Sequence, residues 1–260
     1  MPMERINGFR MYYEVAGQGV PLLFVHGGLG AGSGSATFRQ SQMAALARHA
    51  TVIAFDRRAA GASETPVDGY RFDVFVDDLI ALLDHLGYQQ AVLMGTSAGG
   101  PQVLQCALTY PERVRALVLG STASQTVNVP PQLASLITFL GTEGLSQLQS
   151  MLGPLATPLA AGAAVPGMEP FAGVLQTYLA YHLHGNPIAA RLGEITVPAL
   201  ILHGTADEEV PFEEADRLHA GLSASSLVPF AGGGHRIMVT HAVPYREAII
   251  AFLRTLQASP

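Results

Sequence analysis

One serine in this chain lies in a setting that suits covalent chemistry. The stretch Gly95-Thr96-Ser97-Ala98-Gly99 follows an apolar run at 91–94 and precedes an expected helix at 101–108. Where a strand turns sharply into a helix, the two segments approach closely, so the positions two before and two after the serine must lack bulk. Such a turn holds the serine hydroxyl exposed in strained backbone geometry. The spacing therefore predicts that Ser97 is a nucleophile.

A serine nucleophile needs a base that takes its proton and an acid that orients the base. After this type of turn the acid comes first along the chain and the histidine second. Asp207 lies five residues beyond the apolar run 199–202, and His235 follows three glycines after the run 226–230. Because open α/β sheets place their sites at the carboxyl ends of the strands, we expect both side chains near Ser97. The three residues form a predicted catalytic triad.

Other ionisable residues close to these positions leave alternatives open. Glu208 and Glu209 are competing acids, although they fit the solvated edge of a loop better. His241 is a second candidate base. His26 and His203 each sit at the end of an apolar run, which favours a structural role for both rings.

The segment His26-Gly27-Gly28-Leu29-Gly30 ends an early apolar run with small residues. A backbone without bulky side chains can approach a substrate carbonyl closely. The oxyanion that forms during acyl transfer is stabilised by backbone N–H groups, one of them at the start of the helix after the nucleophile. We assign these donors to Gly28 and Ala98, with Leu29 as the alternative to Gly28.

The composition excludes several kinds of chemistry. All 14 basic residues of the 260-residue chain are arginine, so mechanisms that need a lysine amine are ruled out. The net charge is -6 without a basic cluster, which makes nucleic acid a poor partner. The single cysteine, Cys106, rules out an internal disulfide and a cysteine-rich metal cluster. We expect no metal, no organic cofactor, no membrane span and a cytoplasmic location.

Apolar patterns predict the elements that position these residues. Several apolar runs continue without alternation, as strands do when both faces of a parallel sheet are buried. These runs cover 21–25, 51–55, 91–94, 116–119 and 199–202. Helical segments between several of them imply a parallel sheet with helices on both faces.

Two local patterns add detail. Apolar residues recur with helical spacing in one stripe, at Phe75, Leu79, Leu82, Leu83 and Leu86. Asp77 and Asp78 fall outside this stripe and are expected to face solvent. Near the start of the chain, Asn7-Gly8 between two short runs predicts an antiparallel hairpin.

The segment 122–190 departs from the alternation of strands and helices. It contains no arginine and only two acids, Glu143 and Glu169, and it is too long for a plain loop. We predict a small helical cap, inserted into a core formed by residues 1–121 and 191–260. The predicted substrate contacts are Leu29 and four side chains of the cap: Phe139, Met151, Phe171 and Tyr178.

Together these motifs resemble the α/β-hydrolase family over nearly the whole chain outside the insertion. Ala59 stands where that family usually has a glycine. The resemblance implies an α/β-hydrolase fold: a mostly parallel central sheet, helices on both faces and a small helical cap. It rests on HGG at His26, the loop Asp56–Ser63, GTSAGG at Ser97, the run Tyr110–Leu119, the segment His203–Asp207 and Gly234-His235.

The resemblance also narrows the subfamily. A serine nucleophile argues against the haloalkane dehalogenase and epoxide hydrolase branches, which use aspartate, and the lack of tryptophan argues against the perhydrolase-like branch. The HGG loop is similar to those of proline iminopeptidases and of carbon–carbon bond hydrolases that act on meta-cleavage products. Iminopeptidases need acids to hold an amine, and the insertion has few. Carbon–carbon hydrolases usually need cations near the pocket, for which Arg191 is the nearest candidate.

The sequence therefore predicts a serine hydrolase that cleaves a carboxylic ester or lactone through an acyl-enzyme. The apolar insertion favours a small, largely hydrophobic substrate. Two alternatives stay open: a carbon–carbon bond hydrolase of a meta-cleavage-type diketone, and a ligand receptor on the same fold with little turnover. The oligomeric state is not predicted.

Overall fold

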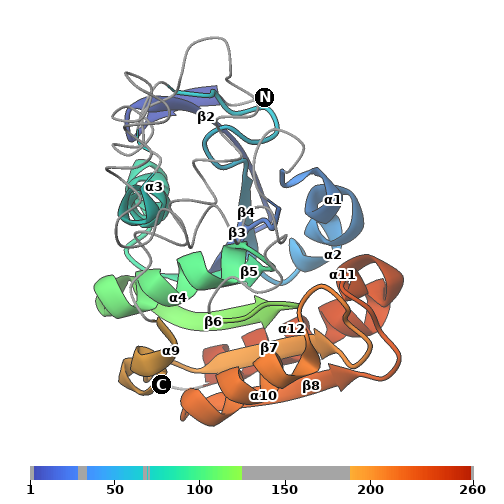
Figure 1. Cartoon of the computed structure of the whole chain (residues 1–260). Coiled ribbons are helices and arrows are strands. Elements are labelled where there is room, and N and C mark those ends of the chain that lie inside the picture. The colour runs from blue at the N-terminus through green and yellow to red at the C-terminus, as the bar shows by residue number, and fades with distance from the viewer. Residues whose placement is uncertain (1–2, 29–33, 67–68, 70, 125–187, 259–260) are drawn as a thin grey trace, which may run out of the picture.

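The structure is a computed structural model, drawn in Figure 1. It describes residues 3–28, 34–66, 69, 71–124 and 188–258. All five predicted substrate contacts lie outside these described residues: Leu29, Phe139, Met151, Phe171 and Tyr178. Most of the segment 122–190 does so as well, and its limits as a cap stay a prediction.

An eight-stranded sheet runs through the described part of the chain, in the order β1-β2-β4-β3-β5-β6-β7-β8 (Figure 1). β2 pairs antiparallel with both β1 and β4, whereas the later neighbours all pair in parallel. This mostly parallel sheet confirms the predicted fold class. The strands are β1 Met3–Ile6, β2 Phe9–Ala16, β3 Pro21–Val25, β4 Thr51–Phe55, β5 Ala91–Thr96, β6 Val114–Gly120, β7 Ala199–Gly204 and β8 Ser225–Phe230.

The predicted hairpin joins β1 to β2. Asn7 and Gly8 have φ angles of 45° and 84°, and Ile6 pairs with Phe9 across the turn. Two successive positive φ angles match the right-handed twist of the flanking strands, and asparagine followed by glycine adopts them at little cost. The hairpin prediction is confirmed.

Helices cover both faces of the sheet, as expected. Side chains of one strand alternate between the faces: Leu23 and Val25 belong to one buried cluster, Leu22 and Phe24 to the other. The first cluster packs under α3 Phe72–His85, α4 Gly99–Thr109, the short turns α9 Ile188–Arg191 and η4 Leu192–Glu194, and α10 Phe212–Gly221. The second packs under the segment α1 Ala36–Phe38, η1 Arg39–Met43 and α2 Ala44–Leu46, and under α11 Ile237–Thr240 and α12 Ala242–Ala258.

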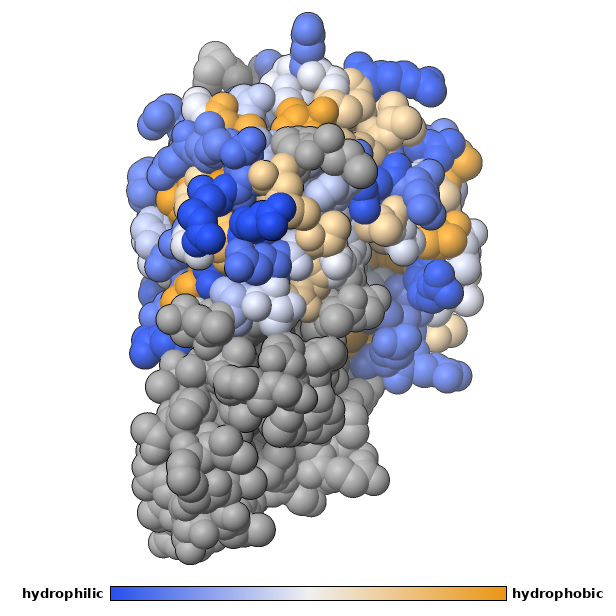
Figure 2. All heavy atoms as spheres, turned by 90° about the horizontal axis from the view of Figure 1, so that it is seen from above, coloured by the Kyte–Doolittle hydropathy of each residue, from blue (hydrophilic) through white to orange (hydrophobic). Residues whose placement is uncertain are grey.

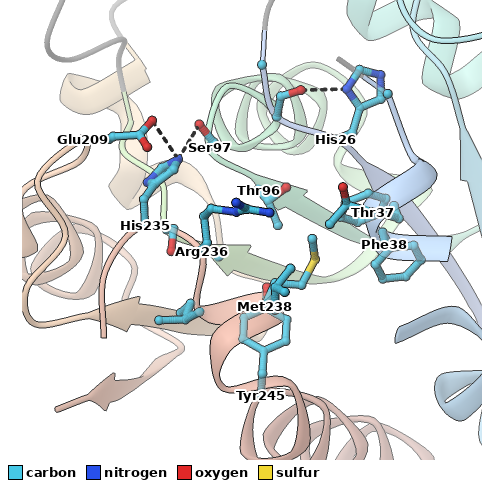
Figure 3. Close-up of a pocket in the computed structure, with 18 residues that line it drawn as sticks. His26, Thr37, Phe38, Thr96, Ser97, Glu209, His235, Arg236, Met238 and Tyr245 are labelled. Carbon is cyan, nitrogen blue, oxygen red and sulfur yellow. Dashed lines mark hydrogen bonds and ion pairs between the residues drawn. The ribbon is translucent and has the colours of Figure 1, made fainter. Parts of the chain in front are cut away.

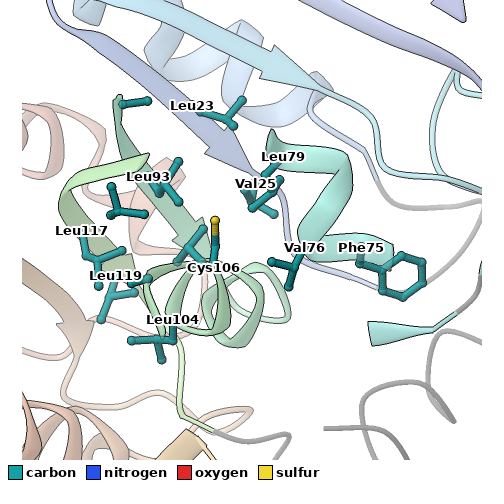
Figure 4. Close-up of a cluster of buried hydrophobic side chains, with 14 of the residues drawn as sticks. Leu23, Val25, Phe75, Val76, Leu79, Leu93, Leu104, Cys106, Leu117 and Leu119 are labelled. Atoms are coloured by element: carbon teal, nitrogen blue, oxygen red, sulfur yellow. The ribbon is translucent and has the colours of Figure 1, made fainter. Parts of the chain in front are cut away.

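Figure 4 shows how the first cluster anchors α4, the helix that follows the serine turn. Leu104 and Cys106 of α4 belong to the same buried cluster as Leu93 of β5 and Leu117 of β6, and all four are fully buried. Burying one leucine side chain contributes about 1.5–3 kcal/mol. The start of α4 is therefore held firmly at the carboxyl end of β5.

The expectation that Asp78 faces solvent is wrong. Its side chain is buried and accepts hydrogen bonds from Arg58 Nε at 2.8 Å and Nη2 at 2.7 Å, and from Asn7 Nδ2 at 2.6 Å. Asp77 is half-buried and accepts from Tyr110 Oη at 2.7 Å. Helical spacing shows which side is apolar, but it cannot show that distant partners cover a charged residue beside the apolar stripe. The buried pair instead ties α3 to the hairpin.

On the face drawn in Figure 2, hydrophilic residues cover much of the described surface, with hydrophobic residues scattered between them. Among the described residues, the large exposed hydrophobic side chains are Val15, Val239 and Val243. Within the same residues, no helix is long and apolar enough to cross a membrane.

Candidate active site

Ser97 occupies the tight turn between β5 and α4. Its φ angle is +50°, in the left-handed region that a residue with a side chain adopts at a cost. A Cβ on Gly95 would lie 2.5 Å from the Gly99 carbonyl oxygen, and a Cβ on Gly99 would lie 2.3 Å from that of Val25. Both glycines are thus required for steric reasons, as the spacing predicted.

Two hydrogen bonds hold this turn. The Ser97 amide donates to the Gly120 carbonyl at 3.0 Å, and the Thr122 hydroxyl donates to the Ser97 carbonyl at 2.5 Å. Ser97 is therefore held by the end of the neighbouring strand β6 and by the segment after it, as well as by its own helix. These bonds offset part of the backbone strain at Ser97.

The structure brings Ser97, His235 and Asp207 together at the carboxyl edge of the sheet, and Figure 3 shows the first two of them. His235 Nε2 lies 3.1 Å from Ser97 Oγ. The other ring nitrogen, Nδ1, lies 2.9 Å and 3.1 Å from the two carboxylate oxygens of Asp207. A serine, a base and an orienting acid in this sequence of contacts can transfer a proton away from the hydroxyl.

Asp207 is buried and well supplied with donors. Its Oδ1 accepts from the amides of Glu209 and Val210, both at 2.9 Å. The His203 ring is also buried, with Nε2 at 2.9 Å from the Val210 carbonyl and 3.4 Å from Asp207. Burial lowers the pKa of His203, so this ring is neutral at physiological pH. His203 packs beside the acid, consistent with the structural role inferred for it.

The competing acids and base are placed elsewhere. Glu208 and Glu209 are exposed. The carboxylate of Glu209 lies 3.7 Å from His235 Nε2, the nitrogen that meets Ser97, so it cannot orient the ring from the opposite side. His241 is bonded to Thr240 and packs against the Phe230 ring.

The glycine loop after β3 lies directly against the nucleophile. A Cβ on Gly27 would lie 2.7 Å from Ser97 Cβ. Gly28, with a φ angle of +72°, lines the cavity beside Ser97 and His235. His26 shapes this loop: Nδ1 contacts the Gly27 carbonyl at 2.7 Å, and Nε2 accepts the Arg57 amide at 3.0 Å. Burial and then the Arg57 charge lower the pKa of His26 to about 3, so its ring stays neutral.

Of the two predicted oxyanion donors, Ala98 directly follows Ser97 and Gly28 lines the same cavity as Ser97. Ala98 is the residue before α4, so its amide belongs to the helix N-terminus. The amide of Gly28 is trans to the Gly27 carbonyl, which turns toward His26, and so it points away from that ring. Arg57 Nη2 donates to the Gly28 carbonyl.

Ser97 and His235 line a cavity of about 520 Å³. Its walls combine apolar side chains with hydroxyl groups and one guanidinium. Residues from β3, α1, β5, the end of β6 and the segment after His235 contribute, among them Phe24, Phe38, Ser121, Arg236, Met238 and Tyr245. Within the described residues, no three His, Cys, Asp or Glu side chains are grouped so that they could hold a metal ion.

A family model described as alpha/beta hydrolase fold matches residues 20–159, more than half of the chain. The chain belongs to the α/β-hydrolase fold family. A second model, described as TAP-like protein, matches residues 183–259. The chain is also 29% identical over 266 residues to a 2-hydroxymuconate semialdehyde hydrolase from Pseudomonas sp. (strain CF600), covering 97% of this chain and 93% of that protein.

Solved structures that match 97–98% of the chain share the α/β-hydrolase fold. A meta-cleavage product hydrolase from Pseudomonas fluorescens IP01 superimposes with a TM-score of 0.77 at 22% identity, covering 98% of each chain. An enol-lactonase from Burkholderia xenovorans LB400 superimposes with a TM-score of 0.76 at 22% identity, covering 97% of this chain and all of that one. These likenesses establish the fold, and the family and its relatives support a hydrolase.

One residue of this α/β-hydrolase pocket escaped the sequence analysis. Arg236 follows His235 directly, and Figure 3 shows its side chain extending toward the middle of the cavity. Its guanidinium has no hydrogen-bond or ion-pair partner among the described residues, and it is the only cationic side chain of the described pocket lining besides the histidines. The signal available in the sequence was its position next to the predicted base.

Arg191 does not fill the role considered for it. It ends α9, which leads through η4 to the amino end of β7, the edge of the sheet opposite the triad. Its guanidinium pairs with Glu194 at 2.8 Å and 2.9 Å. Arg191 directly follows the predicted cap in the sequence, but this position could not show that the length of β7 separates Arg191 from the pocket.

Proposed function

We propose that this α/β-hydrolase cleaves a carboxylic ester or lactone through an acyl-enzyme on Ser97. One observation carries the proposal: the contacts Ser97 Oγ–His235 Nε2 at 3.1 Å and His235 Nδ1–Asp207 at 2.9 Å form a continuous chain beside a cavity. A buried carboxylate bonded to one ring nitrogen holds the proton there and leaves the other nitrogen free to accept one.

The chemistry follows from this arrangement. His235 Nε2 takes the hydroxyl proton while Ser97 Oγ bonds to the substrate carbonyl carbon. The carbonyl oxygen becomes an oxyanion and is bound by the amides of Gly28 and Ala98. His235 then gives its proton to the leaving alcohol oxygen, and the carbon–oxygen bond breaks. Water repeats the sequence on the acyl-enzyme and releases the acid.

The test is a panel of p-nitrophenyl esters and small lactones. We expect a burst of p-nitrophenol or steady turnover with a short acyl ester, and its loss in Ser97→Ala. Phe24, Phe38 and Met238 give part of the pocket wall an apolar surface, which suits an alkyl part of the substrate. Tight binding of these compounds without turnover would support the receptor alternative and contradict the proposal.

A second candidate is a carbon–carbon bond hydrolase of a dienoate-type diketone. Arg236 favours it, because a guanidinium inside the pocket suits a carboxylate-bearing substrate. The sequence relative from Pseudomonas sp. (strain CF600), named as a hydrolase of 2-hydroxymuconate semialdehyde, points the same way. Including one dienoate in the panel separates the two candidates, since its turnover above that of every ester would favour the second.

A further inference from the structure

Two buried hydroxyl groups line the cavity without hydrogen-bond partners among the described residues. Tyr245 is fully buried and Ser121 is 4% exposed. Neither Tyr245 Oη nor Ser121 Oγ bonds to any described side chain or backbone group. Buried polar atoms of folded proteins are nearly always paired, so each exception calls for an explanation.

The two hydroxyls belong to one region, the end of β6 beside the nucleophile. Tyr245 rises from α12, and Figure 3 shows its ring pointing up toward Met238 with the hydroxyl at the cavity end. A Cβ on Gly120 would lie 2.3 Å from Tyr245 Oη, so the hydroxyl rests against the last residue of β6. Ser121 follows immediately. We call Tyr245 and Ser121 the hydroxyl floor of the cavity.

The backbone at Ser121 is held in a costly conformation. Its φ angle is +44°, although it is not a glycine, and its amide donates to the Leu202 carbonyl at 2.9 Å. Strained backbone persists where the surroundings enforce it, and it clusters at ligand sites. Here the strain accompanies a hydroxyl that lines the cavity rather than one that caps a helix or strand.

The chemistry of the hydroxyl floor indicates what it can bind. Phenylalanine would fill the space of Tyr245 without leaving a polar atom unpaired. The Tyr245 hydroxyl therefore lowers the free energy of unfolding relative to phenylalanine. Burial raises the pKa of Tyr245, which keeps the phenol protonated and able to donate. A ligand oxygen accepting from this phenol would restore the missing hydrogen bond.

We propose that Tyr245 and Ser121 form a hydrogen-bonding subsite that binds an oxygen of the substrate away from the bond being cleaved. The group is a hydrogen-bond acceptor: a ketone, a hydroxyl or a carboxylate. This inference rests on the proposed function, because it assigns part of the same substrate. It makes Tyr245 and Ser121 residues of substrate specificity, not of the proton transfer.

The experiment compares matched esters in wild type and Tyr245→Phe. Each pair has the same chain length and differs by one oxygen-bearing group, which is a ketone, a hydroxyl or a carboxylate and is placed either in the acyl chain or in the alcohol chain. The measured quantity is the ratio of kcat/KM for the oxygenated ester to that for the alkyl ester. We expect this ratio to fall by about 3- to 10-fold in at least one series. The carboxylate arm shows whether the oxygen is charged.

Thermal unfolding separates recognition from a structural role. Losing an unpaired buried hydroxyl should raise the Tm of Tyr245→Phe by about 2–4 °C. Tyr110→Phe is the matched control, because its hydroxyl donates to Asp77 at 2.7 Å outside the cavity. We expect that control to lower the Tm and to leave the ratio unchanged. Ser121→Ala should lower the ratio in the same series as Tyr245→Phe.

An unchanged ratio in both Tyr245→Phe and Ser121→Ala would overturn the inference. So would a lowered Tm in Tyr245→Phe with an unchanged ratio, since the hydroxyl would then serve the fold. If wild type cleaves none of the esters, the proposed function fails instead. The subsite is then tested by calorimetry, which measures binding of the same ester pairs to Ser97→Ala and to the double variant Ser97→Ala/Tyr245→Phe. Equal affinities of the two variants for the oxygenated esters would reject the subsite.

Discussion

Gly27 lies so close to Ser97 that a Cβ at position 27 would come within 2.7 Å of the serine Cβ. The glycine loop and the nucleophile turn are therefore fitted to each other across β3 and β5. A side chain at position 27 would therefore displace Ser97 or the loop, and both segments line the same cavity.

Gly27→Ala should reduce kcat by about 100-fold, because the added methyl group displaces Ser97 or the loop from the reacting position. Gly193→Ala is a matched control, since no atom lies within 4 Å of a Cβ there. Ester hydrolysis and circular dichroism of both variants check the prediction. Near-normal turnover in folded Gly27→Ala would contradict the prediction, because the loop would then have moved without displacing Ser97.

Ser97→Ala should lower turnover by about 10³-fold or more and abolish labelling by a fluorophosphonate probe. The reason is that Ser97 Oγ is the group within 3.1 Å of His235 Nε2. Ser41→Ala, at an exposed hydroxyl bonded to its own helix, serves as the control. A variant that keeps a tenth of the activity would place the nucleophile elsewhere.

Asp207→Asn should reduce kcat on the order of 10³-fold, because an amide at 2.9 Å from His235 Nδ1 favours the wrong ring tautomer. Glu208→Gln and Glu209→Gln should change kcat little, since both side chains are exposed. Steady-state kinetics at one pH compares the three. Equal damage from Glu209→Gln would move the role of the acid to that residue.

Arg236→Gln should lower the preference for carboxylate-bearing esters over neutral ones by about 2- to 5-fold, the scale of a partly solvated ion pair. Arg191→Gln is the control, because Arg191 is already paired with Glu194 at the opposite edge of the sheet. The preference is the ratio of kcat/KM values, measured at low salt and again at high salt. If this ratio is changed neither by Arg236→Gln nor by the salt concentration, the main structural support for a charged substrate is lost.

His26 should make stability depend on pH. Its pKa is about 3 in the folded protein and about 6.5 when unfolded, so below pH 6.5 only the unfolded chain gains the proton. The free energy of unfolding should fall as the pH drops from 6.5 toward 3, by at most about 1.4 kcal/mol per unit from this residue. Urea unfolding between pH 7.5 and 5 measures the slope. His26→Gln should flatten it, whatever its absolute stability, and an identical slope would refute the assignment.

The sequence predicted those parts of the fold that repeat a simple pattern. The uninterrupted apolar runs became β3 to β7, and Asn7-Gly8 became the hairpin turn, because strand burial and turn conformation depend on neighbouring residues. Asp78 was misjudged, since its buried partner Arg58 lies 20 positions earlier, and nothing local marks that pairing.

The candidate site divides in the same way. Ser97, Asp207 and His235 could be predicted as a triad because glycines mark the segments that follow their strands, and the structure brings the three side chains together. Arg236 and Tyr245 were missed, although both line the cavity. Their role depends on where a side chain points from a loop and from α12, and that direction is set by packing between distant segments.

Ala59 departs from the usual family sequence, and the turn around it keeps its conformation. It stands where a glycine is usual in the family and has a φ angle of +58°, so it adopts the left-handed conformation expected of that glycine. Its amide donates to the Glu64 carbonyl at 3.0 Å, which holds the turn closed. The turn is kept by its hydrogen bonds despite the added methyl group.

The serine–histidine contact spans 138 positions of the chain. Its two residues follow β5 and β8, strands that reach their places only through the successive pairings of β5 with β6, β6 with β7 and β7 with β8. Loop closure over such separations is slow compared with forming a helix or a hairpin. Recovery of enzymatic activity during refolding will therefore follow completion of the sheet, and it will lag behind the return of helical circular dichroism.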